Sequence, residues 1–144
     1  MKTNAKYVEW LSAEVMHKAS VNWLSELQFI NDEQQFFDDL IKVYTLNLID
    51  SKHFDESQKI VTALSGLQKE TARLIEIVKT HENDLEIMVD GIDQPKEEEA
   101  YKKEHQGLIV VVHEFFRRYR QLKTDLFSLI KTIIKEQKQK RLLE

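Results

Sequence analysis

The stretch KTHENDLEIMVDGIDQPKEEEAYKKEHQGL, Lys79–Leu108, holds a helix end and a helix start on either side of its centre at Asp93. Gly91 suits the left-handed residue that follows a helix, and Pro95 suits the first turn of the next one. Glu97–Glu99 add negative charge where the N-terminal end of a helix is positive. The stretch therefore predicts two helices joined by a short loop, which makes them antiparallel neighbours.

Apolar residues on both sides of this loop, and earlier in the chain, recur at alternating spacings of four and three. That spacing keeps one face of each helix toward its neighbours. The three runs are Trp23, Leu27, Ile30, Gln34, Phe37, Ile41, Tyr44 and Leu48; Ile60, Leu64, Leu67, Thr71, Leu74, Val78, His81, Leu85 and Met88; and Tyr101, His105, Leu108, Val112, Phe115, Tyr119, Leu122, Leu126, Leu129 and Ile133. The apolar residues that widen these stripes are Phe36, Leu40, Val43, Val61, Ile75, Ile109, Phe116 and Ile130. The pattern predicts an all-α fold, an antiparallel bundle of three long helices near 20–50, 56–90 and 95–141.

The joint between the first two helices and the N-terminal segment complete the expected architecture. Asp55 is a candidate N-cap with Gln58 three residues on, as in a capping box. Residues 4–17 form a further helical piece whose apolar stripe is out of phase with the next helix. This piece either kinks near Ser20 or folds back as a short fourth helix. No internal repeat or linker divides the chain, so we expect one domain, 1–144, folded as a three- or four-helix bundle.

The composition excludes several classes of site and partner. The 3 glycines and 1 proline in 144 residues leave few turn positions, as long helices require. The absence of cysteine excludes disulfides, thiolate catalysis and every cysteine-based metal site. A net charge of −4 gives no electrostatic reason to expect nucleic acid or an anionic membrane as partner. The sequence has no signal peptide and no run near the ~20 apolar residues that span a bilayer, so we expect a cytoplasmic protein.

Four segments carry a resemblance to a known group of proteins. They are MHKASVNWLSELQFINDEQQFF, LIDSKHF, THENDLEIMVDG and QPKEEEAYKKEH, and together they spread over most of the chain. The chain resembles small all-helical proteins of flavobacteria and related Bacteroidetes. The resemblance implies an all-helical fold and no particular catalytic residue. The likeness to haemerythrin-like and ferritin-like bundles is architectural only, and a fold does not carry a function.

Two histidines are the strongest candidates for a site. His81 and His105 lie twelve residues to either side of Asp93, so they fall in one layer of an antiparallel bundle. Counting back from the preceding turn brings Trp23 and Glu26 to about the same height. The sequence therefore predicts a polar layer inside the bundle.

Two interpretations of this layer remain open. Two inward imidazoles with a carboxylate have the donor set that zinc, iron or manganese accepts, with His81, His105 and Glu26 as ligands. His17 and Glu33 would complete the shell if the first helix bends. In the other interpretation the layer only fixes the alignment of the helices, and His81 bonds His105 or a carboxylate. The absence of a His-x-x-x-His pair favours this second interpretation.

The remaining polar motifs indicate structure rather than chemistry. Gln34 and Thr71 fall at matching heights and predict a second polar layer in which an amide bonds a hydroxyl. The pair His113–Glu114 is expected on a solvated flank. In FFRRYRQLK, Phe115–Lys123, the helix period turns the aromatic residues inward and the cations outward, so the run does not indicate nucleic-acid binding. No glycine-rich phosphate loop or serine nucleophile pattern is present, so nothing indicates an enzyme.

We therefore expect a non-enzymatic helical bundle that acts in protein binding or assembly, with metal binding as the alternative function. At ~1.5 Å per residue the third helix would run ~65–70 Å, against ~45–50 Å for each of the two before it. Residues after about Lys131 would then project beyond the first turn, with the apolar side chains Ile133, Ile134, Leu142 and Leu143.

The N-terminal piece provides a second apolar surface if it continues the first long helix. Its apolar side chains are Tyr7, Val8, Leu11 and Val15. Two antiparallel copies would cover each N-terminal piece with the C-terminal projection of the other copy, which predicts a homodimer. The rival is a monomer whose N-terminal piece folds back over its own bundle.

Overall fold

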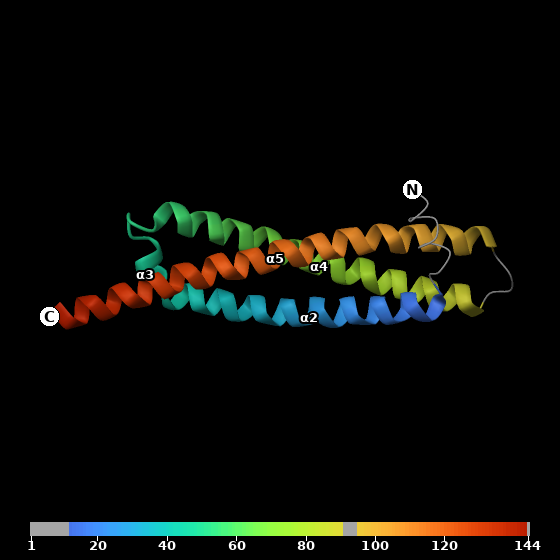
Figure 1. Ribbon diagram of the computed structural model, residues 1–144, viewed down its shortest axis with the longest axis horizontal. Coiled ribbons are helices and arrows are strands. Elements are labelled where there is room, and N and C mark those ends of the chain that lie inside the picture. The colour runs from blue at the N-terminus through green and yellow to red at the C-terminus, as the bar shows by residue number, and fades with distance from the viewer. Residues whose placement is uncertain (1–11, 91–94, 144) are drawn as a thin grey trace. The chain divides into compact units, whose positions relative to one another are not determined.

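The computed structural model describes residues 12–90 and 95–143, and every element in this part of the chain is a helix. In chain order these are α2 (Ala13–Val43), α3 (Thr45–Leu48), α4 (Phe54–Asp90) and α5 (Pro95–Leu143), as Figure 1 shows. The predicted all-α class and the three long helices are confirmed. The fold is a helical bundle.

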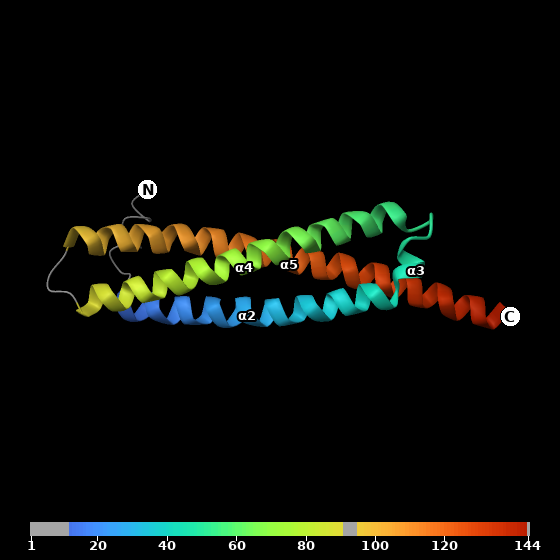
Figure 2. The same ribbon diagram turned by 180° about the vertical axis from the view of Figure 1, so that it is seen from behind.

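The chain forms two compact units. Unit 1 combines Met1–Ile30 with Thr71–Phe115, and unit 2 combines Asn31–Glu70 with Phe116–Glu144. Helices α2, α4 and α5 each contribute one segment to both units. Within each unit the three segments lie side by side in both views (Figures 1 and 2). A single domain over 1–144 stays a prediction.

Unit 1 buries one stripe from each of its three helical segments. The buried apolar side chains are Met16, Trp23, Leu27, Ile30, Leu74, Val78, Leu85, Tyr101, Leu108, Val112 and Phe115. Four polar side chains, Ser20, Thr71, His81 and His105, are buried in the same stripes. The core of this unit is therefore apolar with polar groups at heptad positions.

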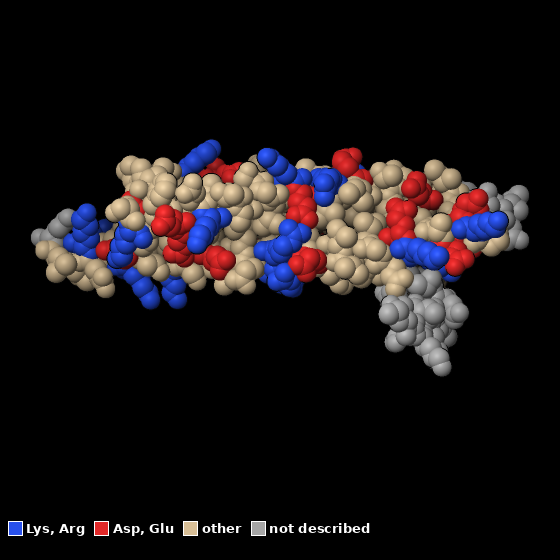
Figure 3. Space-filling view, turned by 90° about the horizontal axis from the view of Figure 1, so that it is seen from above, with Lys and Arg blue, Asp and Glu red and all other residues tan. Residues whose placement is uncertain are grey.

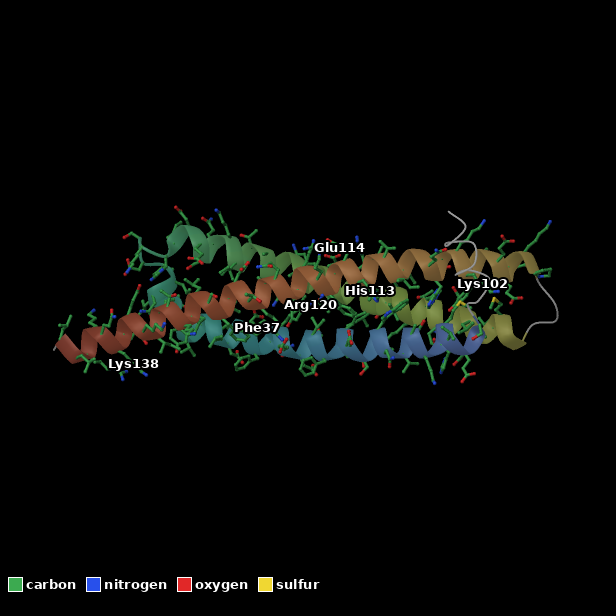
Figure 4. All side chains as sticks on the ribbon, in the orientation of Figure 1. Phe37, Lys102, His113, Glu114, Arg120 and Lys138 are labelled. Carbon is green, nitrogen blue, oxygen red and sulfur yellow. The ribbon has the colours of Figure 1, made fainter. Side chains whose placement is uncertain are left out.

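Unit 2 also has a mainly apolar core, with Gln34, His53 and Ser57 as buried polar side chains. Its buried apolar side chains are Phe37, Leu48, Ile60, Leu64, Leu67, Phe116, Tyr119, Leu122, Leu126, Leu129, Ile130 and Ile133. The ring centroid of Phe37 lies 6.2 Å from that of Tyr119 and 5.5 Å from that of Phe127. Phe37 thus joins α2 to α5, and it is labelled on α2 in Figure 4.

Polar contacts in unit 2 fix the direction of its helices. His53, the residue just before α4, meets late α5 at Glu136, whereas Glu70 of α4 meets an earlier part of α5 at Arg118. Residue numbers that rise along α4 therefore fall along α5, so these two helices are antiparallel as predicted.

The start of α2 differs from the expectation. The helix runs unbroken from Ala13 to Val43, so the predicted kink near Ser20 is wrong. Instead, Ser12 caps the helix, because its hydroxyl oxygen accepts the backbone N–H of Val15 at 3.1 Å. Residues 4–11, which include Tyr7, Val8 and Leu11, lie outside the described residues.

The first long helix also ends earlier than predicted, at Val43 instead of near residue 50. Tyr44 has φ −103° and ψ 16°, outside helical geometry. The hydroxyl of Thr45 lies 3.0 Å from the carbonyl oxygens of both Ile41 and Lys42. A threonine hydroxyl that bonds back in this way competes with the backbone ladder and bends the helix. The four-residue α3 follows this interruption.

The turn between α3 and α4 is organised by Asp50, whose carboxylate accepts the backbone N–H of Lys52 at 3.3 Å. Helix α4 begins at Phe54, so Asp55 lies within its first turn and the predicted N-cap role is wrong. The carboxylate of Asp55 still carries the charge that this helix end favours. Pro95 begins α5 as predicted, whereas Gly91 and Asp93 lie outside the described residues.

The heptad runs predicted the core well and its edges poorly. Every residue of the third run is buried. In the flanking set, Phe116 and Ile130 are buried, but Phe36, Val43 and Val61 are 55%, 74% and 42% exposed. These three residues lie in unit 2, so its apolar surface extends beyond its core.

The end of α5 projects past the turn between α3 and α4, but the projecting part is shorter than predicted. Ile133 is buried, and Glu136 contacts the turn through Lys52 and His53. The projecting part therefore begins near residue 138 rather than residue 131. It extends beyond the α3–α4 connection in both ribbon views (Figures 1 and 2).

Charged side chains of both signs are interspersed on the face that Figure 3 shows. No helix in the described ranges is long and apolar enough to cross a membrane.

Candidate functional site

The two histidines that the sequence singled out meet inside unit 1. Nε2 of His81 on α4 lies 2.9 Å from Nδ1 of His105 on α5. Nδ1 of His81 lies 3.3 Å from Oε1 of Glu104, whose side chain is about half exposed. Both imidazoles are buried, so the pair connects the core of the unit to a carboxylate at its surface.

Two larger aromatic rings enclose the histidine pair. Tyr101 stacks on His81 with ring centroids 4.1 Å apart, and Trp23 of α2 stacks on His105 at 4.9 Å. The Tyr101 hydroxyl donates to the backbone carbonyl of His81 at 2.8 Å. The order Tyr101, His81, His105, Trp23 is thus a row of four rings drawn from all three helical segments of the unit. The predicted height of Trp23 is confirmed.

Burial keeps this row electrically neutral. It lowers the pKa of His105 to about 4, and a charge on neighbouring His81 would lower it further. Burial also lowers the pKa of His81, although the carboxylate of Glu104 opposes this shift. The pKa of Tyr101 is raised, chiefly by burial. Near neutral pH the site therefore consists of two neutral imidazoles and a neutral phenol.

Only one placement of the protons on the neutral histidine pair satisfies its hydrogen bonds. The Glu104 carboxylate only accepts, so Nδ1 of His81 must carry a proton and donate it. Nε2 of His81 then accepts from Nδ1–H of His105. Both rings are assigned the Nδ1–H tautomer, and the chain of donors runs from His105 through His81 to Glu104.

The two remaining predicted ligands do not join the pair. Glu26 is exposed on α2, although it lies less than one turn from Trp23. His17 is about half exposed, and its Nδ1 makes an ion pair with Glu82. In the described ranges 12–90 and 95–143, no group of three or more His, Asp or Glu side chains is placed to hold a metal ion together. The structure therefore brings together His81 and His105 but neither Glu26 nor His17.

Both side chains of the second predicted polar layer are buried. Gln34 in unit 2 is 2% exposed, and Thr71 in unit 1 is fully buried.

His113 and Glu114 are exposed, as expected of a solvated flank, and both are labelled on α5 in Figure 4.

Glu33 belongs to a polar network of unit 2 rather than to a metal shell. Its Oε1 accepts the Tyr119 hydroxyl at 2.7 Å, and Lys123 Nζ lies 3.0 Å from the same oxygen. Nearby, Arg118 makes two bonds to the carboxylate of Glu70, at 2.6 and 2.8 Å. Each of these charged groups has an opposite charge as its partner, so the network aligns helices and exposes no activated nucleophile.

His53 is a buried polar residue that the sequence reasoning missed. Its Nε2 lies 2.9 Å from Oε2 of Glu136, and Lys52 Nζ lies 2.8 Å from Oε1 of the same carboxylate. The hydrogen bond from His53, followed by that from Lys52, lowers the pKa of Glu136. The missed signal is the spacing of His53, Ser57 and Ile60, which extends the second heptad run backward by two positions.

A groove of about 370 Å³ lies in unit 2 among the end of α2, α3 and the start of α4, and we call it the α3 groove. It is lined by Ile41, Thr45, Leu48, Ile49, Phe54, Ser57, Gln58, Val61 and Thr62. None of these side chains is charged. Three of the apolar ones, Ile49, Phe54 and Val61, are 58%, 46% and 42% exposed.

Two other grooves have charged residues in their walls. In unit 2, a groove of about 530 Å³ between α4 and α5 is lined in part by Lys59, Glu70, Arg117 and Asp125. In unit 1, a groove beside Tyr101 is lined in part by Asp84, Glu97 and Glu104. The uncharged wall of the α3 groove distinguishes it from these two grooves, in a chain with 32% charged residues.

Comparison with protein-family models, with curated proteins and with solved structures finds no match for this chain. The resemblance to helical proteins of flavobacteria stays a prediction. The function of the chain is therefore inferred from the geometry of its two units.

Proposed function

We propose that this chain is a non-enzymatic helical-bundle protein that acts in protein binding or assembly. The observation that carries the proposal is the α3 groove, an uncharged concave surface with three large apolar side chains open to solvent. Burial of apolar surface of this kind against a second protein surface is favourable. Neutral polar groups from Thr45, Gln58 and Thr62 supply hydrogen-bonding capacity around it.

The polar side chains of the two units support the same conclusion. The histidine pair, the Glu33 network and the Arg118–Glu70 pair bond one another within their own unit. A catalytic nucleophile requires an adjacent base with an open approach for substrate. The described polar groups instead have the arrangement expected of groups that align helices.

Site-specific photocrosslinking tests the proposal. A benzophenone amino acid replaces Phe54 in the α3 groove, and a matched variant carries it in place of Phe29, which is 63% exposed in unit 1. Illumination in cells is expected to join position 54, and not position 29, to a polypeptide that mass spectrometry identifies. Absence of any protein adduct at position 54 would exclude the groove as a binding surface and overturn the proposal.

The competing function is the binding of a divalent metal ion by the histidine pair. The observation that favours it is the close contact of the His81 and His105 imidazoles. Zinc, iron(II) and manganese(II) are added separately to the purified chain, which is then desalted and analysed for bound metal. Stoichiometric metal that His81→Gln and His105→Gln both abolish would replace protein binding with metal binding. Trace metal that these variants do not change would remove the metal hypothesis.

A further inference from the structure

The end of α5 presents apolar side chains at the same end of unit 2 as the α3 groove. Gln137 Nε2 donates to the side chain of Asn47 at 3.3 Å, which places the last contact of α5 at the level of α3. Residues 138–143 continue as helix beyond this contact, and all of them are exposed. Leu142 and Leu143 are 87% and 89% exposed. We call residues 138–143 the α5 end; Lys138 at its start is labelled in Figure 4.

The α5 end cannot fill the groove of its own chain. Helix α5 is unbroken to Leu143, and it leads away from the turn that joins α3 to α4 (Figure 1). A helix that does not bend cannot return its last residues to a groove on its own flank. An α3 groove that receives an α5 end must therefore belong to another copy of the chain.

The two surfaces match in length. At ~1.5 Å per residue, the groove runs ~12 Å along α4 from Phe54 to Thr62, and the α5 end is ~9 Å long. One and a half turns of helix with two adjacent leucines would cover Ile49, Phe54 and Val61. A pairing of this size buries apolar groups from both sides in one continuous contact.

The two surfaces also match in charge. The α5 end carries Lys138, Lys140 and Arg141 and has no acidic residue among 138–143. Beside the groove, Asp50, Asp55 and Glu56 are exposed at the turn and in the first turn of α4, and Lys52 of the same turn is paired with Glu136. Basic and acidic surfaces that face each other steer two molecules together and fix their orientation.

We propose that the α5 end of one copy binds in the α3 groove of a second copy, and that the second copy returns the same contact. Because the end and the groove lie at the same end of unit 2, two copies related by a two-fold axis exchange them reciprocally and close the assembly at two. This inference rests on the proposed function and names its partner as a second copy of this chain. It differs from the dimer predicted from the sequence, in which the N-terminal piece covers the other copy.

Sedimentation equilibrium of the full chain at micromolar concentration tests the inference. The parent is expected to show twice the 17.1 kDa of one chain. A Leu142→Ser, Leu143→Ser variant is expected to sediment at the mass of one chain with unchanged helical content. The matched control, Ile87→Ser with Val110→Ser, removes two apolar side chains of unit 1 that are 71% and 68% exposed, and it should remain a dimer.

Charge reversal adds a test that a general loss of apolar surface cannot imitate. Asp55→Lys with Glu56→Lys should dissociate the dimer, as should Lys140→Glu with Arg141→Glu. Mixing these two variants makes both contacts of a heterodimer complementary, one with the parent charges and one with reversed charges, so a dimer should form. Combining all four changes in one chain should also restore the dimer. A monomeric parent, or a dimer indifferent to the leucine and charge variants, would overturn the inference.

The crosslinking experiment separates this inference from the proposed function. Adducts from position 54 to residues 138–143 of a second copy support both. Adducts to a different protein, with a monomeric parent, uphold protein binding and overturn the exchange of α5 ends. Absence of all adducts overturns both.

Discussion

His81 and His105 are hydrogen-bonded to each other inside unit 1, with Nε2 of the first 2.9 Å from Nδ1 of the second. Neither imidazole is exposed to water by more than 1%. A buried polar pair that is fully bonded aligns its helices, whereas the same groups unpaired or charged would destabilise the fold.

The stability of the protein should fall as the solution becomes acidic. The folded state lowers the pKa of both histidines, to about 4 for His105, so the unfolded chain takes up protons first as pH falls below 6.5. Stability is therefore fully present above pH 6.5 and is lost as pH falls from there through about 4. Each proton bound only by the unfolded chain lowers the free energy of unfolding by up to about 1.4 kcal/mol per pH unit. Urea denaturation at a series of pH values measures this slope.

The same experiment on a His81→Leu, His105→Leu variant identifies the groups responsible. Carboxylates and other histidines of the chain also titrate, so the difference between parent and variant isolates the buried pair. Glu104, Glu82 and Asp84 contribute opposing charge near His81 and remain in both proteins. Equal slopes in parent and variant between pH 6.5 and 4 would contradict the assignment.

Single and double replacements of the pair should be strongly non-additive. His105→Leu alone leaves Nε2 of His81 buried without its donor, and His81→Leu alone leaves Nδ1–H of His105 without its acceptor. Each is expected to cost about 1–3 kcal/mol, the penalty of an unsatisfied buried polar group. The double variant removes both groups at similar volume and should be as stable as the parent or more stable. Thermal or urea unfolding of all four proteins completes the cycle, and additive losses or a double variant that fails to fold would show a further role for the layer.

A buried serine in α2 predicts a stabilising substitution. Ser20 is 1% exposed, and its hydroxyl has no hydrogen-bond partner in the described residues. Ser20→Ala removes the unsatisfied hydroxyl and improves helix propensity, so it should raise the free energy of unfolding by about 1 kcal/mol. Ser25→Ala on the exposed face of the same helix changes propensity alone and serves as the control. A loss of stability on Ser20→Ala, with Ser25→Ala unchanged, would mean that the Ser20 hydroxyl is bonded.

Ser20 also shows why part of the fold escaped sequence reasoning. Met16, Ser20 and Trp23 continue the spacing of four and three, but the prediction followed Val15 instead of Met16 and placed the apolar stripe out of phase near Ser20. A polar interruption hid His53 and Ser57, which extend the second run toward the turn. Heptad spacing finds helix faces reliably where the residues are apolar, because burial of apolar surface determines the face. Polar residues at those positions depend on partners that the sequence does not specify.

The sequence predicted the position of the candidate site along the helix axes, but not which side of its helix each residue occupies. Equal distances from Asp93 placed His81 and His105 in one layer, and the structure confirms that they meet. The same counting placed Glu26 at their level, but at about 100° per residue it is rotated about 60° from Trp23, past the edge of the buried stripe that continues through Leu27. Glu26 lies on the solvent side instead. A height is set by the number of residues from a turn, whereas contact also requires the right side of the helix.

The tautomers of the two histidines provide the most direct test of the site. Glu104 accepts from Nδ1 of His81, so both neutral rings should carry their proton on Nδ1. Long-range proton–nitrogen correlation spectra of uniformly ¹⁵N-labelled protein at neutral pH distinguish Nδ1–H from Nε2–H rings, and the His81→Leu and His105→Leu variants assign the signals. Glu104→Ala removes the acceptor that fixes the direction of the chain, so it should allow either ring nitrogen of His81 to carry the proton and change the tautomer signature of both rings together. Rings that carry the proton on Nε2 in the parent, or a His105 signal that titrates near 6.5, would contradict the buried and directed pair.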